Sequence, residues 1–542
     1  TAPEGIKREA EVDPSQTITP RTGRKLDYTI ITILAAVIVF MAVERIYFSV
    51  DSGRGETSAA DAAAKSIAVL PFADLSQAQD QGWFADGLAE EILNALVKVP
   101  DLQVSARTSS FAFKGSDKPI SEIAAELGVE HVLEGSVRSS TDRIRVTAQL
   151  IRSSDGFHLW SENYDRDVDD MISIQEDLAL NIATALETSM DPKALAEMAQ
   201  VGTQSIEAYQ NYLRGLQLKQ EALTIAEGSE VFEQAYAHFE ESRTIDPGFS
   251  DAHVQAADYW KVELSPTRTD TGSSGLQPLE MLREYHERIG LAIQSATNEA
   301  DRVRSLADRA MLDLRLHESR RLFNQYLELR PNDEATRFQL LSVLGMLEDE
   351  ASMREILAHW KARGETDGYV ANAYINAAYR IIDPSEAADF GLKSLQRWPN
   401  TTGLIYQTHR TLVWAGRFSE ASVLAARYET LVPGSNPLVR AREACAAGDR
   451  LAAETILAEL DQSRGNTLST TWLIHNMLGN IDEETETLRP LEDNGVLFSL
   501  ATFLNYHKFD PRPYPALMAV LEREGVERSP PAIPPFRCPP PQ

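Results

Sequence analysis

Proline or glycine recurs at a nearly constant interval through the second half of the chain. These anchors stand at Pro331, Gly364, Pro399, Pro433 and Gly465. Successive anchors are separated by 33, 35, 34 and 32 residues. Small or apolar residues stand 12, 8 and 5 positions before each proline anchor, as Ala421, Ala425 and Tyr428 do before Pro433. A period of this length is typical of stacked pairs of antiparallel helices.

Packing explains this interval. Two antiparallel helices with their turns need about 34 residues, and a proline after the second helix stops it before the next pair begins. Each pair buries only one face, so we expect roughly six to eight stacked pairs over residues 204–495, with a concave groove that holds a peptide or a helix. The pattern resembles the tetratricopeptide repeat, which implies that the partners are proteins or peptides.

Length and charge narrow the classes of function. A chain of 542 residues is too long for one hydrophobic core, so several domains are expected. With 81 acidic and 52 basic residues its formal net charge is −29, which excludes binding of nucleic acid by general attraction to phosphate. The two cysteines, Cys445 and Cys538, fall in a helical repeat and a proline-rich tail. This pattern predicts neither a disulfide framework nor a metal-thiolate site.

The sequence contains no recognisable active site. His286 and His317 are each followed by glutamate, but neither has a second histidine four residues later, so a zinc-protease helix is excluded. No glycine loop of the Walker type occurs, and no residues combine into a nucleophile and a base. We therefore predict a protein that is not an enzyme and assign no catalytic residue, no cofactor and no metal ligand.

One acidic run has part of the residue spacing of a calcium loop. Its members take positions 1, 3, 5, 9 and 12 of such a loop: Asp165, Asp167, Asp169, Ser173 and Glu176. The sixth position needs glycine for the sharp turn, but it is Asp170. We favour the alternative that these carboxylates stand at a helix start, where the helix dipole stabilises negative charge.

A single segment has the character of a membrane span. Tyr28 to Val43 carries no charge, and interfacial aromatic residues extend the predicted transmembrane helix to residues 28–50. The cations Arg21, Arg24 and Lys25 precede it, which predicts that residues 1–27 are a cytoplasmic juxtamembrane segment. We expect an inner-membrane protein with a flexible linker over residues 51–65 and everything after about residue 50 in the periplasm.

Residues 66–190 mix strand and helix signals and predict a small α/β domain with a mixed sheet. Strands are expected at Ser66–Leu70, in a hairpin of His131–Arg138 with Arg143–Arg152, and at 156–163. Helices are expected at 84–97, from Pro119 to a stop at Gly128, and at 169–187. Within this domain we expect core positions at Phe72, Phe84, Leu133, Phe157, Leu159 and Trp160. Turn or cap positions are expected at Gly87, Gly128 and Gly135.

Several motifs of this domain carry a resemblance. The segments SIAVLPFADLS, WFADGLAEEILNAL, ELGVEHVLEGSVR and RIRVTAQLI are similar to the amino-terminal domain of TolB-type and FlgO-type envelope proteins. That domain is often joined to tetratricopeptide repeats, also in proteins labelled adenylate-cyclase-like and in CadC-like regulators. The resemblance implies a protein-interaction module and supplies no active site.

Three functions are possible for a chain of this kind. The first is a membrane-anchored envelope scaffold that binds protein partners through the α/β domain and the repeats. The second is the sensory part of a one-component signal transducer with an output domain elsewhere. The third, an enzyme, lacks any supporting residues. Residues 496–542 are expected to form a capping helix through Leu517, Met518 and Leu521, followed by a proline-rich tail.

Overall fold

The structure, a computed structural model, describes most of residues 65–540. The internal stretches outside the described residues are 100, 140–142, 168–169, 187–199, 225–228, 265–275, 364–367, 379–380, 434–435, 462–467, 507–508 and 528–535. Residues 1–64, which make up a separate unit, also lie outside the described residues. The predicted transmembrane segment 28–50 is among them. Among the helices that are described, none has the length and apolar character needed to cross a bilayer.

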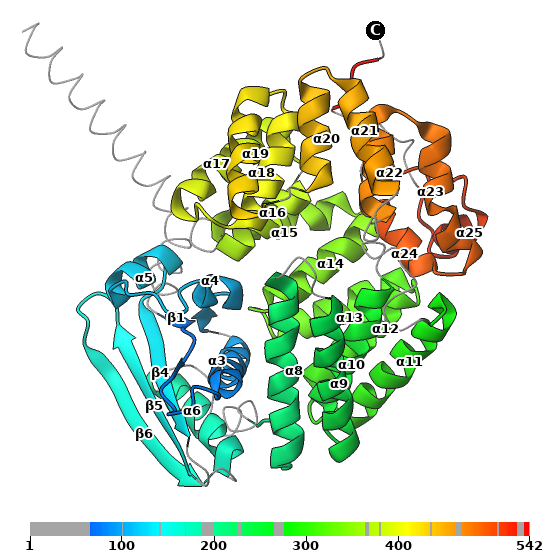
Figure 1. The fold of residues 1–542 in the computed structure, drawn as a ribbon. Helices are drawn as coiled ribbons and strands as arrows, with labels where there is room; N and C mark the ends of the chain where they lie inside the picture. Colours follow the sequence, from blue (N-terminus) through cyan, green and yellow to red (C-terminus); the bar gives the residue numbers. More distant parts are fainter. Residues whose placement is uncertain are drawn as a thin grey trace, which may run out of the picture. The chain divides into compact units, whose positions relative to one another are not determined.

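Within the described part, six strands form one mixed sheet in the order β3-β1-β4-β5-β6, with β2 paired to β4 (Figure 1). Their bounds are β1 Ser66–Val69, β2 Ala73–Asp74, β3 Gln103–Val104, β4 His131–Ser139, β5 Arg143–Arg152 and β6 His158–Asp167. The predicted hairpin is confirmed, because β4 and β5 pair antiparallel with Leu133 opposite Leu150 and Val137 opposite Val146.

Helices cover both faces of this sheet. They are α3 Gly82–Val97, α4 Arg107–Phe111, α5 Ile120–Leu127 and α6 Met171–Ala185. Helices α3 and α6 bury one face, whereas α5 packs its Ile123 and Leu127 against Leu70 and Val132 on the other. The stop of α5 at Gly128 is confirmed, since this residue has the left-handed φ of 68° that glycine adopts without strain.

The predicted core of the last strand was partly wrong. Phe157 is 69% exposed and Leu159 is 36% exposed, whereas Trp160 and Tyr164 pack against the core. The reason is the two-residue period of a strand. Trp160 pairs with Leu150 and Tyr164 with Val146 on the buried face, so Leu159 faces the other way, and Phe157 precedes the strand.

Gly135 is also not the turn residue that we predicted. It lies in the middle of β4, opposite Ala148 of β5. A Cβ atom there would lie 2.7 Å from Cε2 of Phe72 and 2.6 Å from the carbonyl oxygen of Thr147. The glycine is therefore required because the Phe72 ring packs directly on the strand backbone.

After the sheet, the chain is helical. The bounds are α8 Ile206–Thr224, α9 Ser229–Ile245, α10 Ser250–Glu263, α11 Pro278–Ser295, α12 Glu299–Leu312, α13 Leu316–Leu329, α14 Glu334–Met346, α15 Glu350–Arg363, α16 Gly368–Ala378, α17 Pro384–Arg397, α18 Thr402–Trp414, α19 Phe418–Leu431, α20 Pro437–Ala446, α21 Arg450–Asp461, α22 Leu468–Leu478 and α23 Ile481–Asp493. Helix α24 Leu497–Ala501, the 3-10 helix η4 Thr502–Asn505 and α25 Pro515–Arg523 complete the described elements.

From α8 to α23 the described helices form eight consecutive pairs, and each helix packs against its partner. The periodic small residues act as predicted, since Ala387 of α17 and Ala421 of α19 have no exposed surface. Gly416 and Gly448 have positive φ and lie in the turns inside their pairs. The α-solenoid predicted from the 34-residue interval therefore agrees with the helix order.

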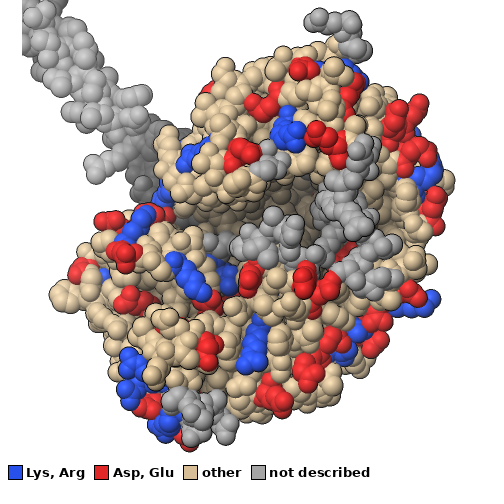
Figure 2. Space-filling model, in the orientation of Figure 1, with Lys and Arg blue, Asp and Glu red and all other residues tan. Residues whose placement is uncertain are grey.

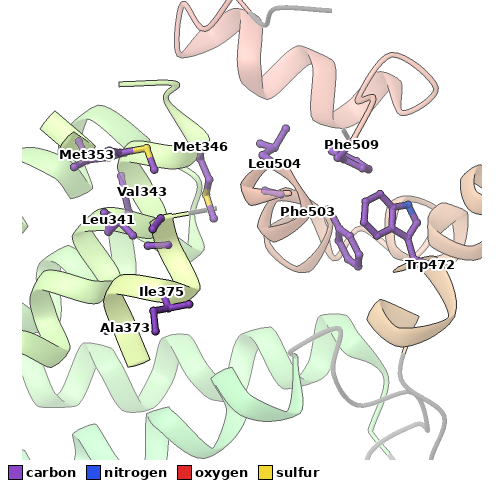
Figure 3. Close-up of a cluster of buried hydrophobic side chains, with 14 of the residues drawn as sticks. Leu341, Val343, Met346, Met353, Ala373, Ile375, Trp472, Phe503, Leu504 and Phe509 are labelled. Carbon is purple, nitrogen blue, oxygen red and sulfur yellow. The ribbon is translucent and has the colours of Figure 1, made fainter. Parts of the chain in front are cut away.

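The C-terminal elements pack back onto earlier repeats. The hydroxyl of Ser499 donates to the carbonyl oxygen of Leu264, and Nδ2 of Asn505 donates to Oγ of Ser342 at 2.9 Å. Figure 3 shows Leu504 of η4 beside Met346 of α14 in the same apolar cluster. The repeats are consequently held together by contacts between helices that are far apart in the chain, in addition to the contacts between successive pairs.

The tail also packs on the repeats, and here the cysteine prediction was wrong. Cys445 of α20 and Cys538 form a disulfide across 93 residues. The amide of Cys538 donates to the carbonyl oxygen of Met477 at 2.9 Å, and the ring of Phe536 meets that of Phe418. Two isolated cysteines far apart in sequence reveal no pairing by themselves, because their proximity arises from the way the tail packs on α19, α20 and α22.

Candidate functional site at the junction of sheet and repeats

Helix α3 belongs to two layers at once. Its Phe84, Leu88 and Ile92 lie in a single apolar cluster with the buried face of the sheet and with Tyr209 and Leu213 of α8. The sheet-bearing segment and the first helix pair consequently share one hydrophobic core. Close-packed cores have little compressibility and transmit displacement. A shift of α8 should therefore also displace side chains on the buried face of the sheet.

Gly87 explains how close the two helices come. We predicted a turn or cap for it, but this glycine lies in the middle of α3. A Cβ atom at this position would lie 3.0 Å from Cδ2 of Leu213 on α8. The helix backbone of α3 therefore lies directly against the Leu213 side chain, and glycine is needed for this approach.

Buried polar groups cross the same junction. The hydroxyl of Tyr212 in α8 donates to Oε1 of Glu91 in α3 at 3.3 Å, and Nδ2 of Asn94 donates to the same oxygen at 3.0 Å. Burial, together with the charges of Asp251 and Glu90, raises the pKa of Glu91 to about 8. Near neutral pH this carboxyl group is therefore largely protonated, which suits a residue enclosed between two helices.

A second carboxylate of α3 is held by an arginine. Oε2 of Glu90 lies 2.8 Å from Nε of Arg107 in α4, whose guanidinium also stands 4.0 Å over the ring of Phe111. Burial raises the pKa of Glu90, while the charge of Arg107 acts in the opposite direction. The pair fixes α4 to α3 at the edge of the junction.

The sequence interpretation missed these carboxylates. It treated WFADGLAEEILNAL as a core helix through its apolar positions alone. Yet Phe84, Leu88 and Glu91 follow one another at the spacing of a single helix face, so a carboxylate stood within the apolar stripe. That combination was the available signal for a buried polar junction.

The junction contains a cavity of about 500 Å³ that is open on one side. Its walls come from the C-terminal turns of α3, the segment 104–107 between β3 and α4, and the segment 330–335 that joins α13 to α14. Gln220, Tyr326, Arg363 and Tyr369 complete the lining. The two sides of the cavity therefore belong to the sheet-bearing segment and to the repeats.

Two sets of hydrogen bonds bridge this junction. Nδ2 of Asn332 donates to the carbonyl oxygens of Val99 and Leu102, both at 3.0 Å. The guanidinium of Arg397 in α17 donates to the carbonyl oxygens of Ala125 and Glu126 near the C-terminus of α5. A cation at that end also suits the helix dipole. Both bridges connect side chains of the repeats to main chain of the sheet-bearing segment.

Residues singled out from sequence elsewhere take packing roles. Tyr212 and Trp360 are buried, and Trp414 packs partly buried on the core of the repeats. In the acidic run, Asp165 pairs with Arg143 and Arg145, and Asp167 with Arg143, while Asp169 lies outside the described residues. No group of three or more potential metal ligands gathers in the part of the chain that the structure describes.

The surface around the repeats is charged with both signs. Figure 2 shows carboxylates and cations interspersed over one face, and a hollow near its centre. Many of the carboxylates are engaged in ion pairs, such as Asp389 with Arg417 and Glu459 with Arg440. On the drawn face the coloured carboxylates are thus interspersed with cations rather than gathered into one patch.

Comparison with known proteins finds a similar regulator domain and a relative with a longer chain. Residues 63–182 match the family described as HilA/YgeH-like transcriptional regulator, second domain. A protein of Rhizobium meliloti (strain 1021) named "Putative adenylate cyclase 3" is 40% identical over 191 residues, which cover 35% of this chain. The match spans 31% of that protein, so the chain corresponds to about a third of its relative. The sheet-bearing segment is thus similar to a domain found in regulators.

Proposed function

We propose that this chain is the sensory and partner-binding part of a bacterial signal transducer, in which the sheet-bearing segment and the helical repeats act as one receiver. The observation that carries the proposal is the core shared by α3 and α8, because a close-packed core transmits a displacement of one part to the other. The match to a regulator domain and the relative named as an adenylate cyclase support the signalling role. The output domain of such a transducer would then lie outside the residues of this chain.

We further propose that a helix at residues 28–50 anchors the receiver in the inner membrane, with the receiver in the periplasm. The uncharged run from Tyr28 to Val43, preceded by Arg24 and Lys25, supports this orientation. The disulfide between Cys445 and Cys538 supports it independently, because disulfides persist in oxidising compartments such as the periplasm. We assign no catalytic step to these residues. The resemblance of the sheet-bearing segment to TolB-type domains is part of the same proposal.

The test is a reporter of output. A cytoplasmic transcriptional activation domain is fused before Thr1 of the full chain, and reporter expression is measured in a bacterial host. We expect the double variant Asn332→Ala, Arg397→Ala to change the basal output while the protein level in the membrane stays constant, because the hydrogen bonds from these two side chains to the main chain of the sheet-bearing segment are lost. The matched control is Asn324→Ala with Arg354→Ala, two solvent-facing positions on α13 and α15.

Two results would contradict the proposal. One is identical output from the wild type, the junction variant and the control. The other is cyclic AMP made by the unfused chain Thr1–Gln542 in a host that lacks its own cyclase, because the activity would then reside in these residues.

An envelope scaffold is the second candidate function. The eight described helix pairs favour it, since stacked pairs of this kind present extended surfaces to protein partners. The same reporter separates the two candidates. If the chain is a scaffold, it retains its partners in crosslinked membranes and the junction variant leaves reporter expression unchanged. If it is a receiver, the junction variant changes reporter expression.

A further inference from the structure

The junction cavity has the size and lining of a small-molecule site. Its volume of about 500 Å³ falls within the range of roughly 300–1,000 Å³ that is usual for ligand pockets. Leu93, Val97 and Val104 give it an apolar wall, and Tyr326 and Tyr369 contribute aromatic rings. A ligand bound there would touch both the sheet-bearing segment and the repeats.

The carboxylates that line the cavity are already satisfied. Glu334 accepts hydrogen bonds from His359, from Nε1 of Trp360 and from Nη1 of Arg363. Burial alone would raise the pKa of Glu334, but these hydrogen bonds and the neighbouring cations lower this pKa to about 2. Asp333 caps the N-terminus of α14 by accepting from the amide of Thr336 at 2.9 Å, and it also accepts from the hydroxyl of Tyr326 at 2.8 Å.

Two of the lining cations are committed to partners in the same way. Arg107 is paired with Glu90, and Arg363 with Glu334. Lys98 and Arg330 differ from them. Among the described residues neither forms an ion pair with a carboxylate, and the guanidinium of Arg330 donates only to the carbonyl oxygen of Leu329, at 3.3 Å. The lining carboxylates Asp333 and Glu334 therefore form no ion pair with Lys98 or Arg330, although the charge of Lys98 also acts on the buried Glu91 and on Asp251.

We propose that this cavity binds a small organic carboxylate, with Lys98 and Arg330 contacting the carboxylate and the apolar wall and tyrosine rings holding its hydrocarbon part. An arginine guanidinium matches a carboxylate through two parallel hydrogen bonds, and a lysine adds a compact charge. Lys98 stands at the end of α3 and Arg330 at the end of α13, so the ligand bridges both sides of the junction. This inference rests on the proposed function, whose input it names by chemical class.

An isosteric series of probes tests the charge requirement. Benzoate, benzamide and benzamidine share one shape and carry negative, no and positive charge. The full chain in detergent is titrated with each by calorimetry. We expect benzoate to bind with a Kd of about 1 mM or tighter, benzamide at least about tenfold more weakly, and benzamidine not at all.

Variants of the full chain test the location. Lys98→Met and Arg330→Met each remove the charge, keep most of the unbranched apolar part of the side chain, and should weaken benzoate binding by about tenfold. Ala335→Trp fills the cavity without changing any charge and should abolish binding. Arg354→Met removes a cation on α15 that does not line the cavity and should leave binding unchanged.

Absence of benzoate binding, equal affinity for all three probes, or binding that survives Ala335→Trp would each overturn the inference. Circular dichroism of each variant shows whether it is folded, so a loss of binding in a folded variant can be assigned to the site. None of these failures would alter the effect of the junction variant on reporter expression. A junction variant that leaves reporter expression unchanged would instead refute the proposed function, while benzoate binding could persist.

Discussion

The hydroxyl of Tyr212 in α8 donates a hydrogen bond of 3.3 Å to Glu91 in α3, across 121 residues of sequence. Both side chains are buried where the sheet-bearing segment meets the repeats. The bond belongs to a junction that also contains the contact of Gly87 with Leu213 and a cavity between the two parts. The junction, rather than either part alone, is therefore the candidate functional centre of the described residues.

The protonation of Glu91 should make stability depend on pH. Because burial and neighbouring carboxylates raise its folded pKa to about 8, the folded protein keeps a proton that the unfolded chain releases near the ordinary value of 4.5. The resulting stabilisation is fully present below pH 4.5 and is lost as the pH rises through about 8. We expect the urea midpoint to fall between about pH 6 and about pH 8.5, and Glu91→Gln to flatten this change.

The control for this measurement is Glu122→Gln, which alters an exposed carboxylate in the first turn of α5. It should leave the slope of the wild type intact. An unchanged pH slope in Glu91→Gln would show that this carboxyl group is ionised in the folded protein.

Two helical glycines should respond in opposite directions to alanine. At Gly215 of α8 a Cβ atom would lie 2.5 Å from Cε1 of Phe239, so Gly215→Ala forces a buried ring to move and should cost about 1–3 kcal/mol. At Gly290 of α11 nothing lies within 4 Å, so Gly290→Ala should stabilise by about 0.5–1 kcal/mol through helix propensity. Urea unfolding measures both, and equal effects would contradict the packing described for α8 and α9.

The bridge from Asn332 should contribute measurably to stability. Asn332→Ala leaves the carbonyl oxygens of Val99 and Leu102 without this donor and should cost about 1–3 kcal/mol of unfolding free energy. The exposed Asn324 on α13 is the matched control, and its replacement by alanine should change stability by less than about 0.5 kcal/mol. Equal effects at the two asparagines would mean that the bridge does not hold the junction.

The disulfide should stabilise the end of the solenoid. Cross-linking Cys445 to Cys538 restricts the unfolded chain over 93 residues, and its loss should cost about 2–4 kcal/mol. Thermal unfolding of the wild type with and without dithiothreitol measures this effect, while the double variant Cys445→Ser, Cys538→Ser should be insensitive to the reductant. Two free thiols in the untreated, air-purified protein would contradict the pairing.

Local patterns predicted much of the fold. The 34-residue interval predicted helix pairs, and the alternation of apolar residues from Ile144 to Leu150 predicted a half-buried strand, which is β5. These signals succeed because a helix or strand face is written in residues that are close in sequence. Phe157 was misjudged because an apolar residue just outside a strand carries the same hydrophobicity as one within it.

The junction could not be predicted in the same way. The need for glycine at position 87 depends on Leu213, and the environment of Glu91 depends on Tyr212, both more than 100 residues away. The pairing of Cys445 with Cys538 depends likewise on where the tail packs on the repeats. Such relationships follow from tertiary packing, for which a single sequence gives no local pattern.

Because the sheet and the first helix pair share one hydrophobic core, we expect them to unfold cooperatively. Hydrogen exchange of the full chain carrying Leu213→Ala tests this expectation most directly, because this fully buried side chain lies between α3 and α8 and its truncation should cost about 2–5 kcal/mol. We predict that amide protection falls together in α8, α3 and β4, whereas the control Leu488→Ala in α23 lowers protection only in the repeats around it. Reduced protection in α8 with unchanged protection in α3 and β4 would contradict the account.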